Sequence, residues 1–247
     1  MAVNGPVRLL LDQGNTRLKW VVAGPQGWLL PPRAATRVGP ALLARWRRIA
    51  PDQVVFASVA AAPARRSLLA GLARQLPEAA IRQPSPAATW QGLRCGYRRP
   101  ERLGIDRWLA LIAAWRDRPG RCLVVSAGSA LTLDRLEEDG RHAGGLIAPG
   151  LAAMRAGLFG AAPGLRRHRG GEAGAGLALD SPEAIASGCL QALVALLARW
   201  RGTGDRVLLG GGDAQTLAAL LAAPVQVRPW LVLEGLDAWS RAPEAAG

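Results

Sequence analysis

The residues best suited to chemistry lie in one short stretch, 9–20 (LLLDQGNTRLKW). Three leucines lead into Asp12, and a glycine and two short polar residues precede an alternating run, which predicts a buried strand, a tight turn and a returning strand. Gly14 allows close approach of a ligand because it has no Cβ. Asn15 and Thr16 offer hydrogen-bond donors to an anion, and Asp12 is suited to hold Mg²⁺ through its water shell. An ordinary hairpin turn is the alternative for this segment alone.

The same pattern occurs a second time in the chain. Residues 122–125 (CLVV) form another apolar run, the small residues 126–130 (SAGSA) follow, and residues 131–136 (LTLDRL) alternate again. A third glycine turn, 210–213 (GGGD), follows the apolar residues 207–209. Two related halves that each present a phosphate-sized turn inward would form a nucleotide-binding cleft between two lobes. The duplication therefore favours a ligand site over an ordinary hairpin.

A second acid, Asp106, lies near the N-terminus of a strongly apolar helix that is expected over 109–115. The preceding segment, 84–100, lacks clear periodicity, and loops of this length in compact domains are often functional. It contains Tyr97, the only tyrosine. A helix N-terminus favours an ionised carboxylate, so Asp106 is a candidate catalytic residue. The alternatives are that Asp106 only caps the helix and that Tyr97 is only a packed aromatic residue.

Alternating strands and helices must position these residues, which predicts an α/β layer architecture. Besides the two hairpins, we expect strands over 28–30, 54–59, 80–82 and 207–212, and helices over 40–50, 64–76, 151–159 and 217–222.

The second half of the chain contains further breaks in the pattern. A helix is expected to start with Ser181 as N-cap and Pro182 at its first position, and to be interrupted at residues 187–188. We expect a glycine-rich loop over 144–150 and a mobile surface loop over 161–176. The polar link 116–121 predicts the boundary between two lobes, 1–118 and 119–247.

Composition excludes several classes of protein for this chain. The chain has 247 residues, half of them hydrophobic, and no apolar run of the length that crosses a bilayer, so neither a membrane protein nor a secretory leader is expected. Three widely spaced cysteines indicate reduced thiols in a cytoplasmic protein, and two separated histidines do not form a metal site. The net charge of +13 comes from scattered arginines without an aromatic-interleaved stripe, which does not favour nucleic-acid binding.

Taken together, these motifs resemble the type III pantothenate kinase (Bvg accessory factor) family over nearly the whole chain. Residues 12–16 (DQGNT) are similar to its first phosphate motif, and 126–132 (SAGSALT) to its second. Tyr97, Pro100 and 103–107 (LGIDR) are similar to its pantothenate and catalytic motif, and 144–150 and 209–213 to its later glycine motifs. Each match alone is weak, whereas their order and spacing make the resemblance specific.

The resemblance implies two ribonuclease-H-like lobes of the acetate and sugar kinase/Hsc70/actin (ASKHA) superfamily and a homodimer. It also implies that ATP and Mg²⁺ are used to phosphorylate pantothenate, the first step of coenzyme A synthesis. Carried over by motif, Asp106 accepts the proton of the pantothenate alcohol. The residues that the resemblance assigns to ATP and its phosphates are Asp12, Gln13, Gly14, Asn15, Thr16, Arg17, Leu18, Lys19, Gly128 and Ser129. Those that it assigns to pantothenate are Tyr97, Gly104, Ile105, Asp106, Arg107 and Ser181. Strand alternation leaves open whether Lys19 faces solvent instead.

The main departure from the family pattern is Ser126, where the family commonly has an aspartate that ligates K⁺ or NH₄⁺. A hydroxyl is a much weaker cation ligand than a carboxylate, so little dependence on a monovalent cation is expected, unless a nearby arginine supplies the positive charge. Ser126 also supports one rival, a family member that lost turnover and acts as a nucleotide-binding or transcription accessory protein. A phosphatase or another small-alcohol kinase on the same fold is a second rival, and charge-driven nucleic-acid binding is a third.

Overall fold

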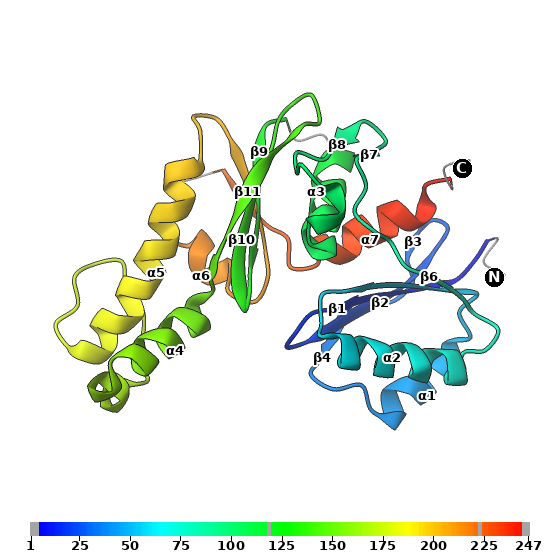
Figure 1. Ribbon diagram of the computed structural model, residues 1–247, viewed down its shortest axis with the longest axis horizontal. Coiled ribbons are helices and arrows are strands. Elements are labelled where there is room, and N and C mark those ends of the chain that lie inside the picture. Colours follow the sequence, from blue (N-terminus) through cyan, green and yellow to red (C-terminus); the bar gives the residue numbers. More distant parts are fainter. Residues whose placement is uncertain (1–4, 118–119, 222–223, 244–247) are drawn as a thin grey trace. The chain divides into compact units, whose positions relative to one another are not determined.

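The computed structural model describes residues 5–117, 120–221 and 224–243, and the chain in it divides into two compact units (Figure 1). The first unit combines Met1–Gln91, Tyr97–Asp117 and Trp230–Gly247, and the second combines Gly92–Gly96 with Arg118–Pro229. The boundary expected between residues 118 and 119 lies outside the described residues. The division differs from the expected lobes in two places, because a C-terminal segment returns to the first unit and residues 92–96 belong to the second.

The first unit is built on a mixed sheet in the order β3-β2-β1-β5-β6, with β4 beside β2. β1 is antiparallel to β2 and parallel to β5, which is parallel to β6. The strands of this sheet are β1 (Arg8–Gln13), β2 (Leu18–Gly24), β3 (Gly27–Trp28), β4 (Arg33–Ala35), β5 (Gln53–Ser58) and β6 (Ala80–Arg82). The other elements are α1 (Pro40–Ile49), α2 (Ala62–Gln75), β7 (Thr89–Trp90), the 3₁₀ helix η1 (Pro100–Arg102), α3 (Ile105–Arg116) and α7 (Leu231–Arg241).

Strand alternation sorts the residues of β1 onto two faces. Leu9 and Leu11 belong to the core cluster that also holds Trp46 of α1 and Leu72 of α2. The opposite face of the sheet carries α3 and α7 (Figure 1). Asp12 is one residue beyond Leu11 and therefore points to this second face. The turn between β1 and β2 thus lies at the ends of these strands, and Asp12 lies on the α3 side of the sheet.

The C-terminal helix α7 joins the first unit through a buried charged contact and close backbone packing. Arg8 at the start of β1 forms an ion pair of 3.2 Å with Asp237, and its guanidinium also donates to the Ser240 hydroxyl. A Cβ at Gly235 would lie 1.8 Å from the Leu109 carbonyl oxygen, so only glycine allows α7 to approach α3 this closely. These contacts explain why the first unit includes the end of the chain.

The second unit repeats the sheet of the first, in the order β11-β10-β9-β12-β13. β9 is antiparallel to β10 and parallel to β12, as β1 is to β2 and β5. Its elements are β8 (Leu93–Arg94), which pairs with β7, then β9 (Cys122–Ala127), β10 (Ala130–Leu136), β11 (His142–Pro149), α4 (Leu151–Ala161), the 3₁₀ helix η2 (Pro163–His168), α5 (Ser181–Trp200), β12 (Arg206–Gly210), α6 (Ala214–Ala218) and β13 (Val225–Val227). The repeated strand, turn and strand expected from the sequence is confirmed.

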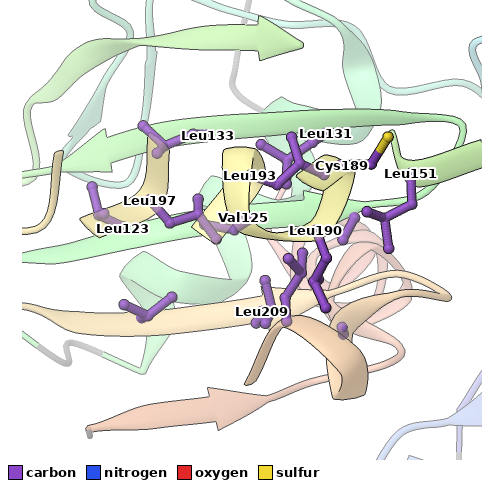
Figure 2. Packing of buried hydrophobic residues seen from close by; sticks show 14 residues of the cluster. Leu123, Val125, Leu131, Leu133, Leu151, Cys189, Leu190, Leu193, Leu197 and Leu209 are labelled. Atoms are coloured by element: carbon purple, nitrogen blue, oxygen red, sulfur yellow. The ribbon is translucent and has the colours of Figure 1, made fainter. Parts of the chain in front are cut away.

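The core of the second unit lies between this sheet and α5. Figure 2 shows Leu190, Leu193 and Leu197 of α5 beside strand residues that include Val125 and Leu133. By length and composition α5 could cross a membrane, since it has 20 residues and a mean hydropathy of 1.4, although the sequence showed no run long enough. Its leucine stripe is instead used to cover the sheet.

Residues 144–150 were expected to form a loop, but most of them belong to β11, which pairs with β10. Two residues of β11 oppose Arg135 alone, because Asp134 pairs with Gly145 and Leu136 with His142. Gly144 has φ +106° and accommodates this bulge. The pairing is long-range, so the local glycine pattern concealed a strand.

The interruption expected at residues 187–188 was also wrong, because α5 is continuous. Gly188 costs a helix about 1 kcal/mol relative to alanine, which the buried leucine stripe offsets. Ser187 is buried, and its hydroxyl accepts a hydrogen bond from the Gly174 N–H at 2.9 Å. The segment 161–176, expected to be a mobile loop, contains η2. The bond from Gly174 to Ser187 ties the end of this segment to α5.

Two other boundaries differ from expectation. The strand expected over 28–30 is limited to β3, Gly27–Trp28, and the helix expected over 217–222 is the shorter α6, Ala214–Ala218. Residue 222 lies outside the described part of the chain. The remaining expected helices and strands are present with ends shifted by a few residues.

Candidate active site

The β1–β2 turn has the geometry expected for a small polar cradle. The Gly14 N–H donates to the Arg17 carbonyl at 3.0 Å, which closes the turn and leaves Asn15, Thr16 and Arg17 exposed. Gln13 is directed elsewhere, since its side-chain oxygen accepts from the Ser58 hydroxyl at 2.9 Å. Three residues of the turn are therefore exposed at its surface, whereas Gln13 is tied to β5 through Ser58.

Asp12 is buried on the α3 side of the sheet, with 7% of its surface exposed. Burial raises the pKa of its carboxyl group to about 6. The charge of Lys19 opposes this rise, and that of Asp106 adds to it. Lys19 pairs directly with Asp12 in the β1–β2 register, so the two side chains share a face. The structure thus brings together two acids and one lysine from β1, β2 and α3.

Asp106 is not the N-cap residue of its helix. The N-cap of α3 is Gly104, and Asp106 is the second helical residue. Its Oδ1 accepts a hydrogen bond from the Arg107 backbone N–H at 2.9 Å. A Cβ at Gly104 would lie 2.6 Å from that same oxygen, so glycine at this position leaves room for the carboxylate. The capping alternative is wrong.

Tyr97 and Arg107 form one polar unit beside Asp106. The Arg107 Nη1 donates to the Tyr97 hydroxyl at 2.6 Å, and the guanidinium carbon lies 5.3 Å from the centre of the tyrosine ring. Arg107 is buried, with 4% of its surface exposed. Ile105 begins α3 between Gly104 and Asp106. The motif that the sequence singled out is therefore a contiguous cluster in the first unit.

The second unit contains a matching turn between β9 and β10, where three glycine segments converge. The Gly128 N–H donates to the Ala130 carbonyl at 3.0 Å, which closes this turn one residue more tightly than the bond from Gly14 to Arg17 closes the first. A Cβ at Gly150 would lie 1.9 Å from the Gly128 carbonyl oxygen, and one at Gly211 would lie 2.0 Å from that of Ala127. The backbones of β9, β11 and β12 meet there closely enough to require glycine.

Ser126 and Ser181, which the sequence also singled out, both lie in the second unit. Ser126 is at the end of β9 and pairs with Thr132 of β10. Ser181 begins α5 and is exposed, but it is not the N-cap. Asp180 is the N-cap, and its carboxylate accepts from the Glu183 N–H at 2.9 Å. The Ser181 hydroxyl is therefore not used to cap the helix.

A pocket of about 440 Å³ lies beside the first turn. It is lined by residues 13–18 together with residues of α1, α2 and the segment 36–38, and includes Arg17, Arg37 and Arg74. Asp12, Lys19 and Asp106 are not among its lining residues, so this pocket lies on the α1–α2 side of the turn. In the described part of the chain, no group of three His, Cys, Asp or Glu side chains is arranged to hold a metal ion.

Comparison with known proteins identifies relatives of the whole chain. A family model described as type III pantothenate kinase matches residues 8–201. The chain is 38% identical to a type III pantothenate kinase of Laribacter hongkongensis, over 92% of this chain and 96% of that protein. It is 37% identical to one of Nitrosospira multiformis, over 96% of this chain and 92% of that protein.

Solved structures share the fold at low sequence identity. A Baf family protein of Campylobacter jejuni, described as a transcriptional activator, gives a TM-score of 0.60 at 19% identity over 93% of this chain and 95% of that one. The activator of 2-hydroxyisocaproyl-CoA dehydratase from Clostridium difficile, with bound ADPNP, gives a TM-score of 0.55 at 13% identity. The match covers 94% of this chain and 93% of that one. The two sheets of this chain have the same strand order, and together with the similarity to these structures this confirms the ASKHA fold.

Proposed function

The chain belongs to the type III pantothenate kinase family, and we propose that it transfers the γ-phosphoryl group of ATP to the primary alcohol of pantothenate. The products are ADP and 4′-phosphopantothenate, and the reaction is the first step of coenzyme A biosynthesis. One observation carries the assignment of the reacting groups: strand register and the start of α3 bring Asp12, Lys19 and Asp106 together.

Asp106 is the general base in this proposal. A primary alcohol is a poor nucleophile at neutral pH, and a carboxylate within hydrogen-bond reach orients it and takes its proton during transfer. One carboxylate oxygen is held by the Arg107 N–H, which fixes the direction of the group. We assign the carboxylate of Asp106 to the alcohol.

Asp12 is the residue that would hold Mg²⁺. A buried carboxylate whose charge is disfavoured by burial and by a neighbouring acid is suited to bind a cation. Mg²⁺ usually takes one or two carboxylates and completes its shell with water and phosphate oxygens. When bound, it neutralises charge on the transferred phosphoryl group. Lys19, on the same face as Asp12, is positioned to contribute a second positive charge.

Tyr97 and Arg107 are the groups that we assign to pantothenate. The substrate carries a carboxylate, which a guanidinium binds well. The hydrogen bond from Arg107 to the Tyr97 hydroxyl fixes the direction of the guanidinium. We assign the carboxylate of pantothenate to this pair and the alcohol, at the other end of the substrate, to Asp106. We assign Gly104, Ile105 and Ser181 to the same substrate by their place in the family motifs.

For ATP, we propose that the two hairpin turns bind the phosphates. In the first turn, Asn15, Thr16 and Arg17 offer exposed donors beside Gly14, and Leu18 begins the returning strand. In the second turn we assign this part to Ser129, while Gly128, whose N–H closes the turn, has no Cβ to obstruct the phosphate. Oriented backbone N–H groups of this kind stabilise charge that develops on a phosphoryl group.

We also propose that the chain is a cytoplasmic homodimer, in which a second copy covers an apolar surface of α4 and α5. Only Leu151 of the apolar helix α4 is buried. A shallow pocket between these helices is lined by Met154, Leu158, Ala184, Ile185, Gly188 and Cys189. Unpartnered apolar surfaces of this kind mark interaction sites. Ile185→Glu should shift the chain to monomer in sedimentation, and an unchanged mass would contradict the proposal.

A coupled assay of ADP release, with and without pantothenate, tests the proposed reaction. Asp106→Asn should lower kcat by about 10²–10⁴-fold with little change in the KM for ATP, because the proton acceptor is lost while the phosphate-binding turns are intact. Asp117→Asn, an exposed acid at the other end of α3, is the matched control and should keep full activity. Absence of pantothenate-dependent turnover in the native chain, or near-native turnover in Asp106→Asn, would refute the proposal.

A further inference from the structure

The segment just before Tyr97 is anchored to the hairpin of β10 and β11. The Arg94 N–H donates to the Gly140 carbonyl at 2.8 Å, and the Arg94 guanidinium pairs with Asp139 at 2.5 Å. Gly96 ends this segment, which belongs to the second unit, and Tyr97 is the first residue of the next segment of the first unit. A single peptide bond therefore separates an anchored residue from the tyrosine that we assign to pantothenate.

His142 of β11 provides the contact at Gly96. The imidazole is completely buried, and its Nε2 lies 2.8 Å from the Oδ1 of Asp134, which is itself only 2% exposed. The Gly96 N–H donates to Nδ1 at 3.4 Å. Because a backbone N–H can only donate, Nδ1 is the acceptor and Nε2 carries the proton toward Asp134. Asp134 therefore selects the tautomer that receives Gly96.

A second contact fixes the same glycine. A Cβ at Gly96 would lie 1.8 Å from the His142 carbonyl oxygen, so the two backbones touch and only glycine fits. His142 thus holds Gly96 through both its ring and its main chain. Sequence analysis only excluded a metal site for His142, because its role as a hydrogen-bond acceptor depends on the pairing of β10 with β11.

We propose that His142, oriented by Asp134, is a positioning residue for pantothenate. It acts through Gly96, which it holds so that the next residue, Tyr97, meets Arg107 at 2.6 Å. Consecutive Cα atoms are held 3.8 Å apart, so the position of Gly96 limits where Tyr97 can lie. The residues that we assign to ATP all lie outside this segment. The inference rests on the proposed function, because it assigns the substrate of Tyr97.

Two substitutions of His142 separate its two hydrogen bonds. The amide of His142→Asn reaches the position of Nδ1 and can still accept from Gly96, whereas that of His142→Gln reaches the position of Nε2 and can only contact Asp134. Both replace the same buried ring, and each keeps only one of its two hydrogen bonds, so the melting temperature of each variant is measured beside its KM values. His142→Gln should raise the KM for pantothenate about five- to tenfold, the usual effect of losing one hydrogen bond. Its KM for ATP should be unchanged, and His142→Asn should be close to the native chain in both constants.

A third variant avoids the buried ring. Gly96 is exposed, so Gly96→Ala should fold, yet its Cβ displaces the segment from the His142 carbonyl. It should also raise the KM for pantothenate without changing that for ATP. In a Tyr97→Ala background, neither His142→Gln nor Gly96→Ala should have a further effect on this constant.

Three results would each overturn the inference. The first is that His142→Asn and His142→Gln have equal effects, and the second is that His142→Gln changes the KM for ATP as much as that for pantothenate. The third is that Gly96→Ala leaves the KM for pantothenate unchanged. These results differ from a failure of the proposed function, in which the native chain itself would not phosphorylate pantothenate.

Discussion

Replacement of Asp12 by asparagine should make the protein more stable at neutral pH while removing its activity. The carboxylate is buried, and its pKa is raised from 3.8 to about 6, first by burial and then by Asp106, against the pull of Lys19. The ionised form is therefore disfavoured in the folded chain. Asparagine keeps the shape of the side chain and has no charge to bury.

The size and sign of the effect follow from proton linkage. Between about pH 4 and pH 6, the folded chain keeps a proton on Asp12 that the unfolded chain has released, so the free energy of unfolding falls as the pH rises. A shift of about two pKa units corresponds to about 3 kcal/mol. Asp12→Asn should therefore gain up to about 3 kcal/mol over the native chain at pH 8, and almost nothing at pH 4.

Urea denaturation in EDTA from pH 4 to pH 8 measures this difference. Tryptophan fluorescence reports on the first unit, because eight of the nine tryptophans belong to it, all except Trp200. Glu78→Gln, at an exposed site in the same unit, controls for the loss of a negative charge. Mg²⁺ with ATP should stabilise the native chain more than Asp12→Asn. The argument would be refuted if the free energy of unfolding of Asp12→Asn did not exceed that of the native chain at pH 8, or exceeded it by as much at pH 4.

Three other predictions concern different parts of the chain. Because Ser126 is a weak cation ligand, turnover should be similar in sodium-only and potassium buffers, while Ser126→Asp should introduce potassium stimulation; strong stimulation of the native chain would contradict this. Arg8→Met, which breaks the buried ion pair with α7, should cost about 2–4 kcal/mol by urea denaturation. Arg116→Met, at an exposed pair, should cost less than about 1 kcal/mol, and equal losses would disprove the difference. Gly211→Ala, at φ +98° and facing the Ala127 carbonyl, should lower the melting temperature and raise the KM for ATP, unlike Gly157→Ala in open space on α4; similar behaviour of the two variants would count against it.

The sequence by itself determined the repeated hairpin and the order of the motifs. Alternating apolar residues and the glycine, asparagine and serine of the two turns act through local backbone preferences, so 9–20 and 122–136 could be recognised without a structure. The same residues established the resemblance to the family. Helices such as α1 and α2 followed from apolar spacing within one segment.

Only the tertiary structure decided which of these residues meet. Asp12 and Asp106 lie far apart in the sequence, and their proximity depends on the face of β1 that α3 covers. The glycines of β11 adopt a strand because β10 supplies their hydrogen-bond partners, and α7 returns to the first unit because Arg8 and Gly235 fit it there. The hydrogen bond between His142 and Gly96 likewise joins distant segments. Such long-range pairing depends on register and burial, which the local pattern of the chain does not encode.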